Sequence, residues 1–321
     1  MISESPVFDF FAIGETVIDL ITEQMIDSLA SAKKLHIFVG GQSTNLAINL
    51  ALLGRQTALA ACLGEDGLGE MAYQRLDAAG VNLDYIQYTN AAPTTISIIA
   101  RHKTTADFTI HRGADTFLEF DTRLYDGINK SRIVHSSAFS IARQPARSTI
   151  LRALGVAHDL GCLVTFDPNY HPRIEPDTVE FESELITAFQ YVDITKPSLD
   201  DCIRLFGPGL SLLEYAENFM EWGPSVVLIT MGAEGVFLAT SSGDQFQVYP
   251  DPVNVSDITG AGDAFWSGYL LAWLEGASPL EAACFGQVVA GVKVKVMGPI
   301  TQMPVYTKLR ERAGQIKYRK L

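Results

Sequence analysis

Short apolar runs with strand-forming composition alternate along the chain with longer segments whose apolar positions recur at helical spacing. The short runs predict strands at residues 7–13, 57–63, 132–136, 162–166, 192–195 and 226–230. The longer segments predict helices at residues 45–53, 68–79, 145–160, 199–206, 212–222, 263–274 and 279–294. Strands that are apolar throughout are covered on both faces. The pattern therefore predicts an α/β fold in which a mostly parallel central sheet lies between two layers of helices.

Two segments interrupt this rhythm and carry strand signals with few helical ones. They are residues 17–22 and residues 94–110, the second of which reads TTISIIARHKTTADFTI. We expect a small β-strand lid, inserted at about residues 15–37 and 92–112, that covers a site at the edge of the sheet. Because no Pro/Gly-rich linker divides the chain, we expect residues 1–321 to form one domain that carries this lid.

The charge balance argues against a nucleic-acid or membrane-surface partner. The chain has 24 Lys and Arg residues and 37 Asp and Glu residues, which gives a net charge of −13, whereas such partners need basic surface. A small phosphate ligand is not excluded, because its binding depends on nearby backbone amides and metal ions and not on the net charge of the chain. The four cysteines lie far apart with no C-x-x-C pair, and no signal peptide or long apolar run occurs. We therefore expect reduced thiols and a cytoplasmic location.

The segment around residues 257–274 has the strongest chemical signal. Gly260, Ala261 and Gly262 form a run of small residues that leads directly into an apolar helix. Small residues let backbone amides approach a ligand closely, and the unpaired amides of a helix start attract anions. Asp263 follows at once, where a carboxylate could accept a proton from a hydroxyl beside a transferring phosphoryl group. The alternative from these residues alone is that Asp263 only caps the helix.

A second glycine-containing segment opens another helix. Gly40 and Gly41 are followed by Ser, Thr and then Asn45, and Gly54 follows the helical pattern. Exposed backbone and a short amide side chain suit hydrogen bonding to a polyol, although an ordinary loop and helix cap would have the same residues.

Together these segments resemble the two signatures of the ribokinase/PfkB family of carbohydrate kinases, and within it the fructokinase-like branch. Other ordered matches are Gly14-Glu15 with Asp19, Gly64-Glu-Asp-Gly-Leu-Gly69 with Gly80-Val81, Asp167-Pro-Asn169, Lys196-Pro197 and Thr230-Met-Gly-Ala-Glu-Gly235. The similarity covers nearly the whole chain. It implies a ribokinase-like three-layer sandwich and an ATP-dependent kinase that phosphorylates a sugar hydroxyl.

The resemblance also implies residue roles. Asp263 would be the base, and the amides of residues 260–263 would form an anion hole, which would also favour the ionised form of Asp263. The sugar would be held by Asp19, Gly40, Gly41, Asn45, Arg112 and Asn169. The nucleotide would be bordered by Lys196, Thr230, Gly232 and Gly235.

The expected cofactors are ATP and Mg²⁺, and the ion would be carried mainly by ATP phosphates and water. The family often has N-x-x-E after Lys-Pro, where this chain has Ser198-Leu-Asp-Asp201, so Asp201 would assist Mg²⁺ only indirectly. Asp257 and Thr259 match a monovalent-cation loop of some relatives, which leaves the use of K⁺ open.

Several alternatives concern the class of protein and the acceptor. The early G-x-G-x-x-G of a dehydrogenase and the G-x-x-x-x-G-K-[ST] of a P-loop kinase are both absent. A neutral ketohexose such as fructose is the preferred acceptor, because Asp19 would repel an acid. A 2-keto-3-deoxygluconate-type sugar-acid kinase, a nucleoside kinase and a non-catalytic binding module remain open, as does a homodimer joined through the lid.

Overall fold

A nine-stranded sheet forms the centre of the molecule in a computed structural model, which describes residues 6–101, 107–174 and 178–321. The strand order is β15-β14-β13-β12-β11-β10-β9-β1-β4, and the strands from β12 to β4 pair in parallel. The parallel strands are β1 (Phe8–Ile13), β4 (Thr57–Ala60), β9 (Ser131–Ser137), β10 (Leu163–Asp167), β11 (Ile194–Thr195) and β12 (Val226–Thr230). An antiparallel extension follows, made of β13 (Val236–Thr240), β14 (Gln245–Val248) and β15 (Tyr318–Lys320).

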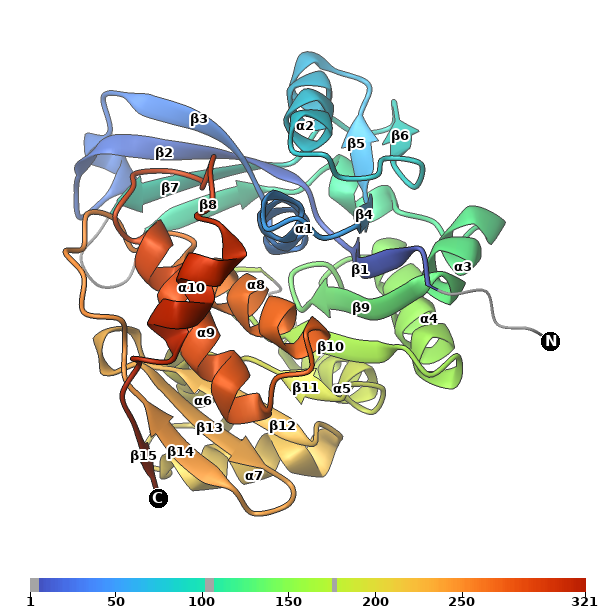
Figure 1. The fold of residues 1–321 in the computed structure, drawn as a ribbon. Coiled ribbons are helices and arrows are strands. Elements are labelled where there is room, and N and C mark those ends of the chain that lie inside the picture. The colour runs from blue at the N-terminus through green and yellow to red at the C-terminus, as the bar shows by residue number, and fades with distance from the viewer. Residues whose placement is uncertain (1–5, 102–106, 175–177) are drawn as a thin grey trace.

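Helices cover both faces of this sheet, as Figure 1 shows. In β1, Phe10 and Ala12 belong to one hydrophobic core, whereas Phe11 and Ile13 belong to the other. The first core packs against α1 (Gln42–Leu52), α2 (Gly67–Ala78), α8 (Ala261–Leu274), α9 (Pro279–Lys293) and α10 (Tyr306–Ala313). The second packs against α3 (Thr122–Asn129), α4 (Ala146–Asp159), α5 (Thr178–Phe189), α6 (Leu199–Phe206) and α7 (Leu212–Trp222). The predicted three-layer α/β sandwich is confirmed.

A separate four-stranded sheet has the order β3-β2-β7-β8 and lies at the upper left of Figure 1. It consists of β2 (Val17–Met25), β3 (Leu35–Gly40), β7 (Ile96–Arg101) and β8 (Phe108–His111). The predicted lid strands therefore exist and pair with one another, mainly in antiparallel fashion. Residues 102–106 of the predicted lid segment lie outside the described residues. Because β3 ends at Gly40 and α1 begins at Gln42, this sheet connects directly to a helix of the sandwich.

The prediction of one strand over residues 57–63 was wrong. The chain forms β4, which pairs with β1 in the large sheet, and then β5 (Cys62–Gly64), which pairs with β6 (Gln87–Thr89) in a two-stranded sheet. The whole run is buried, so an unbroken apolar pattern could not reveal the change of partner. Helix α1 also begins three residues earlier than predicted, because a buried carboxylate accepts hydrogen bonds from its first amides.

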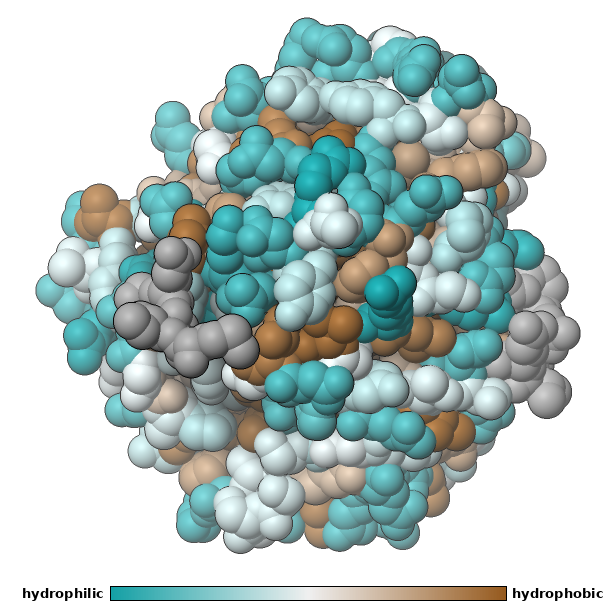
Figure 2. Space-filling view, turned by 90° about the vertical axis from the view of Figure 1, so that its right-hand side faces the viewer, coloured by the Kyte–Doolittle hydropathy of each residue, from teal (hydrophilic) through white to brown (hydrophobic). Residues whose placement is uncertain are grey.

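The outer surface is mostly polar on the side that carries α3 and α4. Figure 2 shows this face, where hydrophobic areas are small and lie between hydrophilic ones. Within the described ranges, no helix combines the length and the apolar character needed to cross a lipid bilayer.

Candidate active site

The carboxyl ends of the parallel strands and the starts of α1 and α8 bring three predicted site residues together with two further acids. Glu15 follows β1, Asp167 ends β10 and Lys196 follows β11, while Asn45 and Asp263 lie in the first turns of α1 and α8. In open α/β sheets, ligands bind beyond the carboxyl ends of the strands. The predicted site therefore lies where the topology favours one.

Asp263 lies in the first turn of α8 and is half-buried. The Asn45 side-chain amide donates to Asp263 Oδ2 at 2.8 Å, which joins two helices separated by 218 residues in sequence. Burial raises the pKa of Asp263 to about 7, and Asp167 and Glu15 add to this effect, while Asn45 and Lys196 oppose it. We expected the helix start to favour the ionised carboxylate and so to lower its pKa. Burial has the larger effect on the pKa, and Asp263 can therefore take up or release a proton near neutral pH.

The turn before Asp263 presents amides and leaves space above them. Gly260 adopts the left-handed conformation, with φ 73°, and is the N-cap of α8. The amide of Ala261 is already used, because it donates to the Ile258 carbonyl oxygen at 3.1 Å. First-turn amides of a helix have no carbonyl partner in their own helix, so those of Gly262 and Asp263 are suited to an anion. The predicted four-amide anion hole is thus reduced by the bond that Ala261 makes.

Lys196 lies beside this turn. Its Nζ is 3.5 Å from the position that a Cβ on Gly262 would occupy, so a larger residue at 262 would contact the ammonium. Lys196 is buried and pairs with Asp167 Oδ2 at 2.8 Å. Burial alone would lower the pKa of Lys196, but Asp167, Asp263 and Asp201 outweigh it and raise the pKa. A permanent positive charge therefore lies next to the helix start.

Asp167 links this lysine to the core of the sheet. Its Oδ2 also accepts a hydrogen bond from Gln42 Nε2 at 2.6 Å, and Gln42 Oε1 lies 3.0 Å from His135 Nε2. Burial and the nearby Lys196 lower the pKa of His135 to about 3, so this imidazole is neutral. These contacts fix the Asp167 carboxylate and hold Lys196 in place.

Asp19 approaches the same region from the small sheet. A Cβ on Gly40 would lie 1.9 Å from Asp19 Oδ2, so a side chain at residue 40 would displace the Asp19 carboxylate. The pKa of Asp19 is raised to about 7, mainly by burial and also by the charges of Asp263 and Glu15. Gly41 has φ 99°, and its position against the Glu15 carbonyl likewise excludes a side chain. The two glycines of the motif therefore let the Asp19 carboxylate and the Glu15 carbonyl lie close to the backbone of residues 40 and 41.

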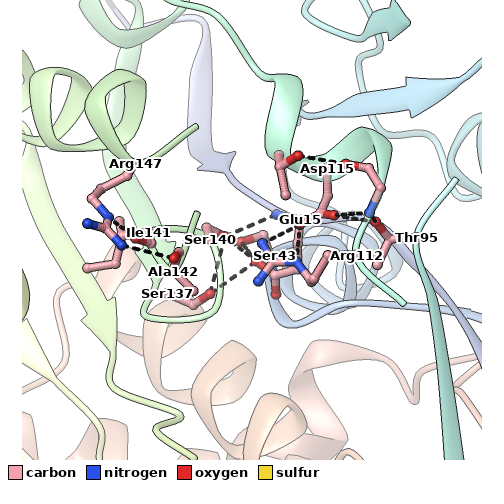
Figure 3. A network of polar contacts seen from close by, with 12 residues as sticks. Glu15, Ser43, Thr95, Arg112, Asp115, Ser137, Ser140, Ile141, Ala142 and Arg147 are labelled. Atoms are coloured by element: carbon pink, nitrogen blue, oxygen red, sulfur yellow. Dashed lines mark hydrogen bonds and ion pairs between the residues drawn. The ribbon is translucent and has the colours of Figure 1, made fainter. Parts of the chain in front are cut away.

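Glu15 anchors the start of α1 (Figure 3). Its Oε1 accepts from the amides of Gln42 at 2.6 Å and Ser43 at 3.3 Å. Its Oε2 accepts from the hydroxyls of Ser43 at 3.2 Å and Ser137 at 3.0 Å, and from that of Ser140. Five donors thus satisfy a carboxylate that is only 2% exposed. The carboxylate joins the turn after β1 to the start of α1, to the end of β9 and to the loop that follows β9.

Arg112 is held in a fixed orientation at the end of β8 (Figure 3). Its Nε and Nη2 donate to Asp115 Oδ2 at 2.9 and 2.5 Å, and its guanidinium lies 4.1 Å above the ring of Phe139. Phe139 lies in the loop that supplies Ser140 to Glu15. The remaining nitrogen, Nη1, is buried without a hydrogen-bond partner among the described residues. One nitrogen of Arg112 is therefore left unsatisfied in this structure.

Two other predicted residues lie close to this centre. Asn169 is exposed, has a positive φ of 34°, and donates its backbone amide to Asp167 Oδ1 at 3.0 Å. Asp201 forms a capping box with Ser198 at the start of α6, and its Oδ1 accepts from the Tyr170 amide at 2.9 Å. Ser198 and Asp201, which depart from the family's N-x-x-E pattern, thus cap the start of α6. The indirect role of Asp201 toward Mg²⁺ stays a prediction.

The predicted nucleotide-side turn connects β12 to β13. The Thr230 amide donates to the Pro197 carbonyl at 2.9 Å, which places this turn next to the one that carries Lys196. Gly232 and Gly235 have positive φ values of 55° and 88°, and a Cβ on Gly235 would lie 2.1 Å from the Val248 carbonyl oxygen. Glycine at residue 235 therefore allows the turn after β12 to lie against the end of β14.

Comparison with known proteins decides the family. The model of the pfkB family carbohydrate kinases matches residues 8–305. The chain belongs to this family. It is 29% identical to an ATP-dependent 6-phosphofructokinase of Thermoanaerobacterium thermosaccharolyticum, over 92% of this chain and 91% of that protein. It is 26% identical to a 5-dehydro-2-deoxygluconokinase of Clostridium beijerinckii, over 94% and 91%.

Among solved structures, the chain resembles the Halothermothrix orenii fructokinase, with a TM-score of 0.76 and 29% identity. The match covers 91% of this chain and all of that one. The predicted family and its fructokinase-like branch are confirmed, and the chain is a carbohydrate kinase.

Sequence reasoning about this pfkB kinase assigned no role to four residues that organise the site: Glu15, Gln42, His135 and Asp167. Of these, Glu15 and Asp167 were named only as matches to the family pattern, and Gln42 and His135 were not named. Asp167 ends a strand and Glu15 lies two residues after one, which was a usable signal. Gln42 and His135 had none, because their importance follows from contacts across 93 residues of sequence. In the described part of the chain, no cluster of three or more His, Cys, Asp or Glu side chains is arranged to hold a metal ion.

Proposed function

We propose that this pfkB kinase transfers the γ-phosphoryl group of ATP to a hydroxyl of a ketohexose such as fructose. The observation that carries the proposal is the position of Asp263, which is oriented by Asn45 in the first turn of α8 and lies in the field of Lys196. A general base, helix-start amides and a fixed ammonium are the groups that phosphoryl transfer to a hydroxyl requires.

The phosphate side of the site fits ATP. The amides of Gly262 and Asp263 would donate to the transferring phosphoryl group, and the absence of a side chain at Gly262 leaves room for it beside Lys196. Mg²⁺, when bound with ATP, neutralises phosphate charge, and we expect ATP oxygens and water to be its main ligands. Thr230, Gly232 and Gly235 would border the nucleotide from the turn after β12.

The base acts through one oxygen of Asp263. Asn45 occupies Oδ2, so Oδ1 is the atom that would accept the proton of the acceptor hydroxyl. With its pKa raised to about 7, the carboxylate is a stronger base than an exposed aspartate and is still substantially ionised at neutral pH.

The charges around the acceptor side favour a neutral sugar. Asp115 already neutralises Arg112 and leaves one Nη1 edge, which suits a hydroxyl better than a bidentate carboxylate. Asp19, which is buried near Asp263 and Glu15, adds acidic character. Asn45, Asn169 and the backbone at Gly40 and Gly41 would supply the remaining polar contacts to the sugar.

The relatives motivate the alternatives to be tested. One is named for fructose 6-phosphate chemistry and another for a dehydro-deoxygluconate, which is a sugar acid. A nucleoside acceptor and a homodimer through the lid also stay predictions. We further propose that the chain acts as one catalytic domain, with the four-stranded sheet as its lid.

The experiment is an ADP-release assay with Mg·ATP and a panel of fructose, fructose 6-phosphate, a keto-deoxy sugar acid and a nucleoside. We expect the highest kcat/KM with fructose. Asp263→Asn should lower kcat about 100-fold or more while it keeps the fold and nucleotide binding. A sugar acid or sugar phosphate preferred by tenfold would replace the proposed acceptor, and no ADP release with any acceptor would favour a non-catalytic binding protein.

A further inference from the structure

Lys293 is a buried cation whose position the proposed reaction does not explain. It is the last residue of α9, on the sandwich face that also holds α8, and it is 3% exposed. Its side chain runs beneath the turn that begins α8, because its Cε lies 3.6 Å from the position of a Cβ on Gly260. A lysine is rarely buried to this extent without a partner.

The partners of Lys293 are oxygen atoms of two loops. Its Nζ donates to the Val296 carbonyl oxygen at 3.2 Å and lies 3.7 Å from Asp257 Oδ2. Asp257 also accepts from the amides of Thr259 at 3.1 Å and Gly298 at 3.2 Å. One carboxylate and one ammonium therefore join the segment before the helix start to the segment after α9.

The backbone reinforces this junction. The amides of Ser256 and Asp257 both donate to the Val294 carbonyl oxygen, at 2.7 and 3.1 Å. The two segments thus run alongside each other for several residues, with the ammonium between them. Any displacement of Asp257 would move Thr259 and Gly260, and with them the amides that follow.

The sequence had indicated Asp257 and Thr259 as part of a monovalent-cation loop. A potassium ion in a protein is held by carbonyl and carboxylate oxygens that replace its water shell. Here the oxygens of Asp257 and Val296 already face a compact ammonium with three donors. The residues present therefore do not fit an additional K⁺ at these oxygens.

We propose that the Lys293 ammonium takes the place of a monovalent cation under the anion-binding turn, so that this enzyme works without K⁺. Lys293 is a positioning residue, since it acts through Asp257 and the turn and not on the reacting atoms. The inference rests on the proposed role of residues 260–263 in binding the nucleotide phosphates.

The test measures nucleotide binding, which requires no knowledge of the acceptor. The affinity for Mg²⁺ with a non-hydrolysable ATP analogue is determined by calorimetry in potassium chloride and in tetramethylammonium chloride of equal ionic strength. The wild-type Kd should agree within about twofold between the two salts, a difference below 1 kcal/mol. Lys293→Met keeps the approximate length of the side chain but leaves the Asp257 carboxylate without its positively charged partner. Its Kd should be weakened about tenfold in tetramethylammonium chloride and recover in potassium chloride.

Two control variants separate cation replacement from general effects of charge. Lys295→Met removes an exposed lysine two residues further on, and it should behave as wild type. The double variant Lys293→Met/Asp257→Asn lacks both charges, and it should not respond to K⁺.

Thermal melting without nucleotide gives a second reading, in which K⁺ should raise the Tm of Lys293→Met but not that of wild type. A wild-type Kd that improves tenfold or more with K⁺ would overturn the proposal, as would a folded Lys293→Met protein with no response to K⁺. If the analogue fails to bind wild type in either salt, the proposed nucleotide site is wrong. The comparison of Tm values between wild type and Lys293→Met would still test whether K⁺ can replace the Lys293 ammonium.

Discussion

At the scale of single residues, the site depends on carboxyl groups kept close to the point of protonation. Asp263 and Asp19 have pKa values raised to about 7, in both cases mainly by burial and partly by the negative charges of nearby carboxylates. Below this pH each group is protonated, and a protonated Asp263 cannot accept the hydroxyl proton. The same desolvation that strengthens the base therefore limits the pH range in which it works.

We accordingly expect kcat/KM to fall about tenfold per pH unit below about pH 7 in the free enzyme. Asn45 lowers the pKa of Asp263 by donating to its carboxylate, so Asn45→Ala should move the midpoint of this decline to higher pH. A pH–rate profile from 5.5 to 8.5, measured with both proteins, checks the two statements. A profile that stays flat down to pH 5.5 would show that Asp263 does not need to be ionised.

At the scale of elements, the start of α1 is set by a residue from another strand. Glu15 accepts five hydrogen bonds, two of them from the first amides of the helix. Glu15→Gln replaces an acceptor oxygen by an amide donor that faces hydroxyl donors. We expect a loss of about 3 kcal/mol in the free energy of unfolding, as for other buried polar groups left without partners.

Urea unfolding, followed by circular dichroism, measures this loss. The matched control is Glu23→Gln, because Glu23 is exposed and its Lys34 partner lies 3.6 Å away. Such a surface pair contributes at most about 1 kcal/mol. If the two variants were equally stable, the Glu15 cluster would have no part in fixing α1.

The elements that the sequence could predict are those whose ends are marked by nearby residues, unlike the start of α1. The strand at residues 226–230 and the helices at 199–206 and 212–222 were predicted with the observed bounds, because β-rich runs, serine caps and glycine ends mark them locally. The division of residues 57–63 between two sheets has no local signal, since every residue in it is buried. Likewise, Gly260–Asp263 and Asn45 were identifiable from motifs, whereas the approach of Lys293 to Asp257 depends on how α9 ends.

At the scale of the whole molecule, the small sheet and the sandwich meet where the acids gather. Asp19 on β2 lies against Gly40 at the end of β3, and the chain then enters α1, which carries Asn45. The outer part of the small sheet is solvent-exposed at Leu35 and Ile37, whereas the end next to Gly40 is buried. Solvent-exposed segments of this kind open at low cost in free energy.

We expect this sheet to close on the sugar and not on ATP, since Asp19 and Arg112 are carried at its ends and both are proposed to hold the acceptor. Closure would exclude water and prevent ATP from being hydrolysed. Hydrogen exchange of β2, β3 and β7 should slow when fructose is added and change little with Mg²⁺ and an ATP analogue alone. Helix α7, which packs against β12 and β13 of the large sheet, serves as the internal control and should exchange equally in all conditions. Equal exchange of the small sheet with and without sugar would contradict the lid, and slowing by the nucleotide alone would assign its closure to the other substrate.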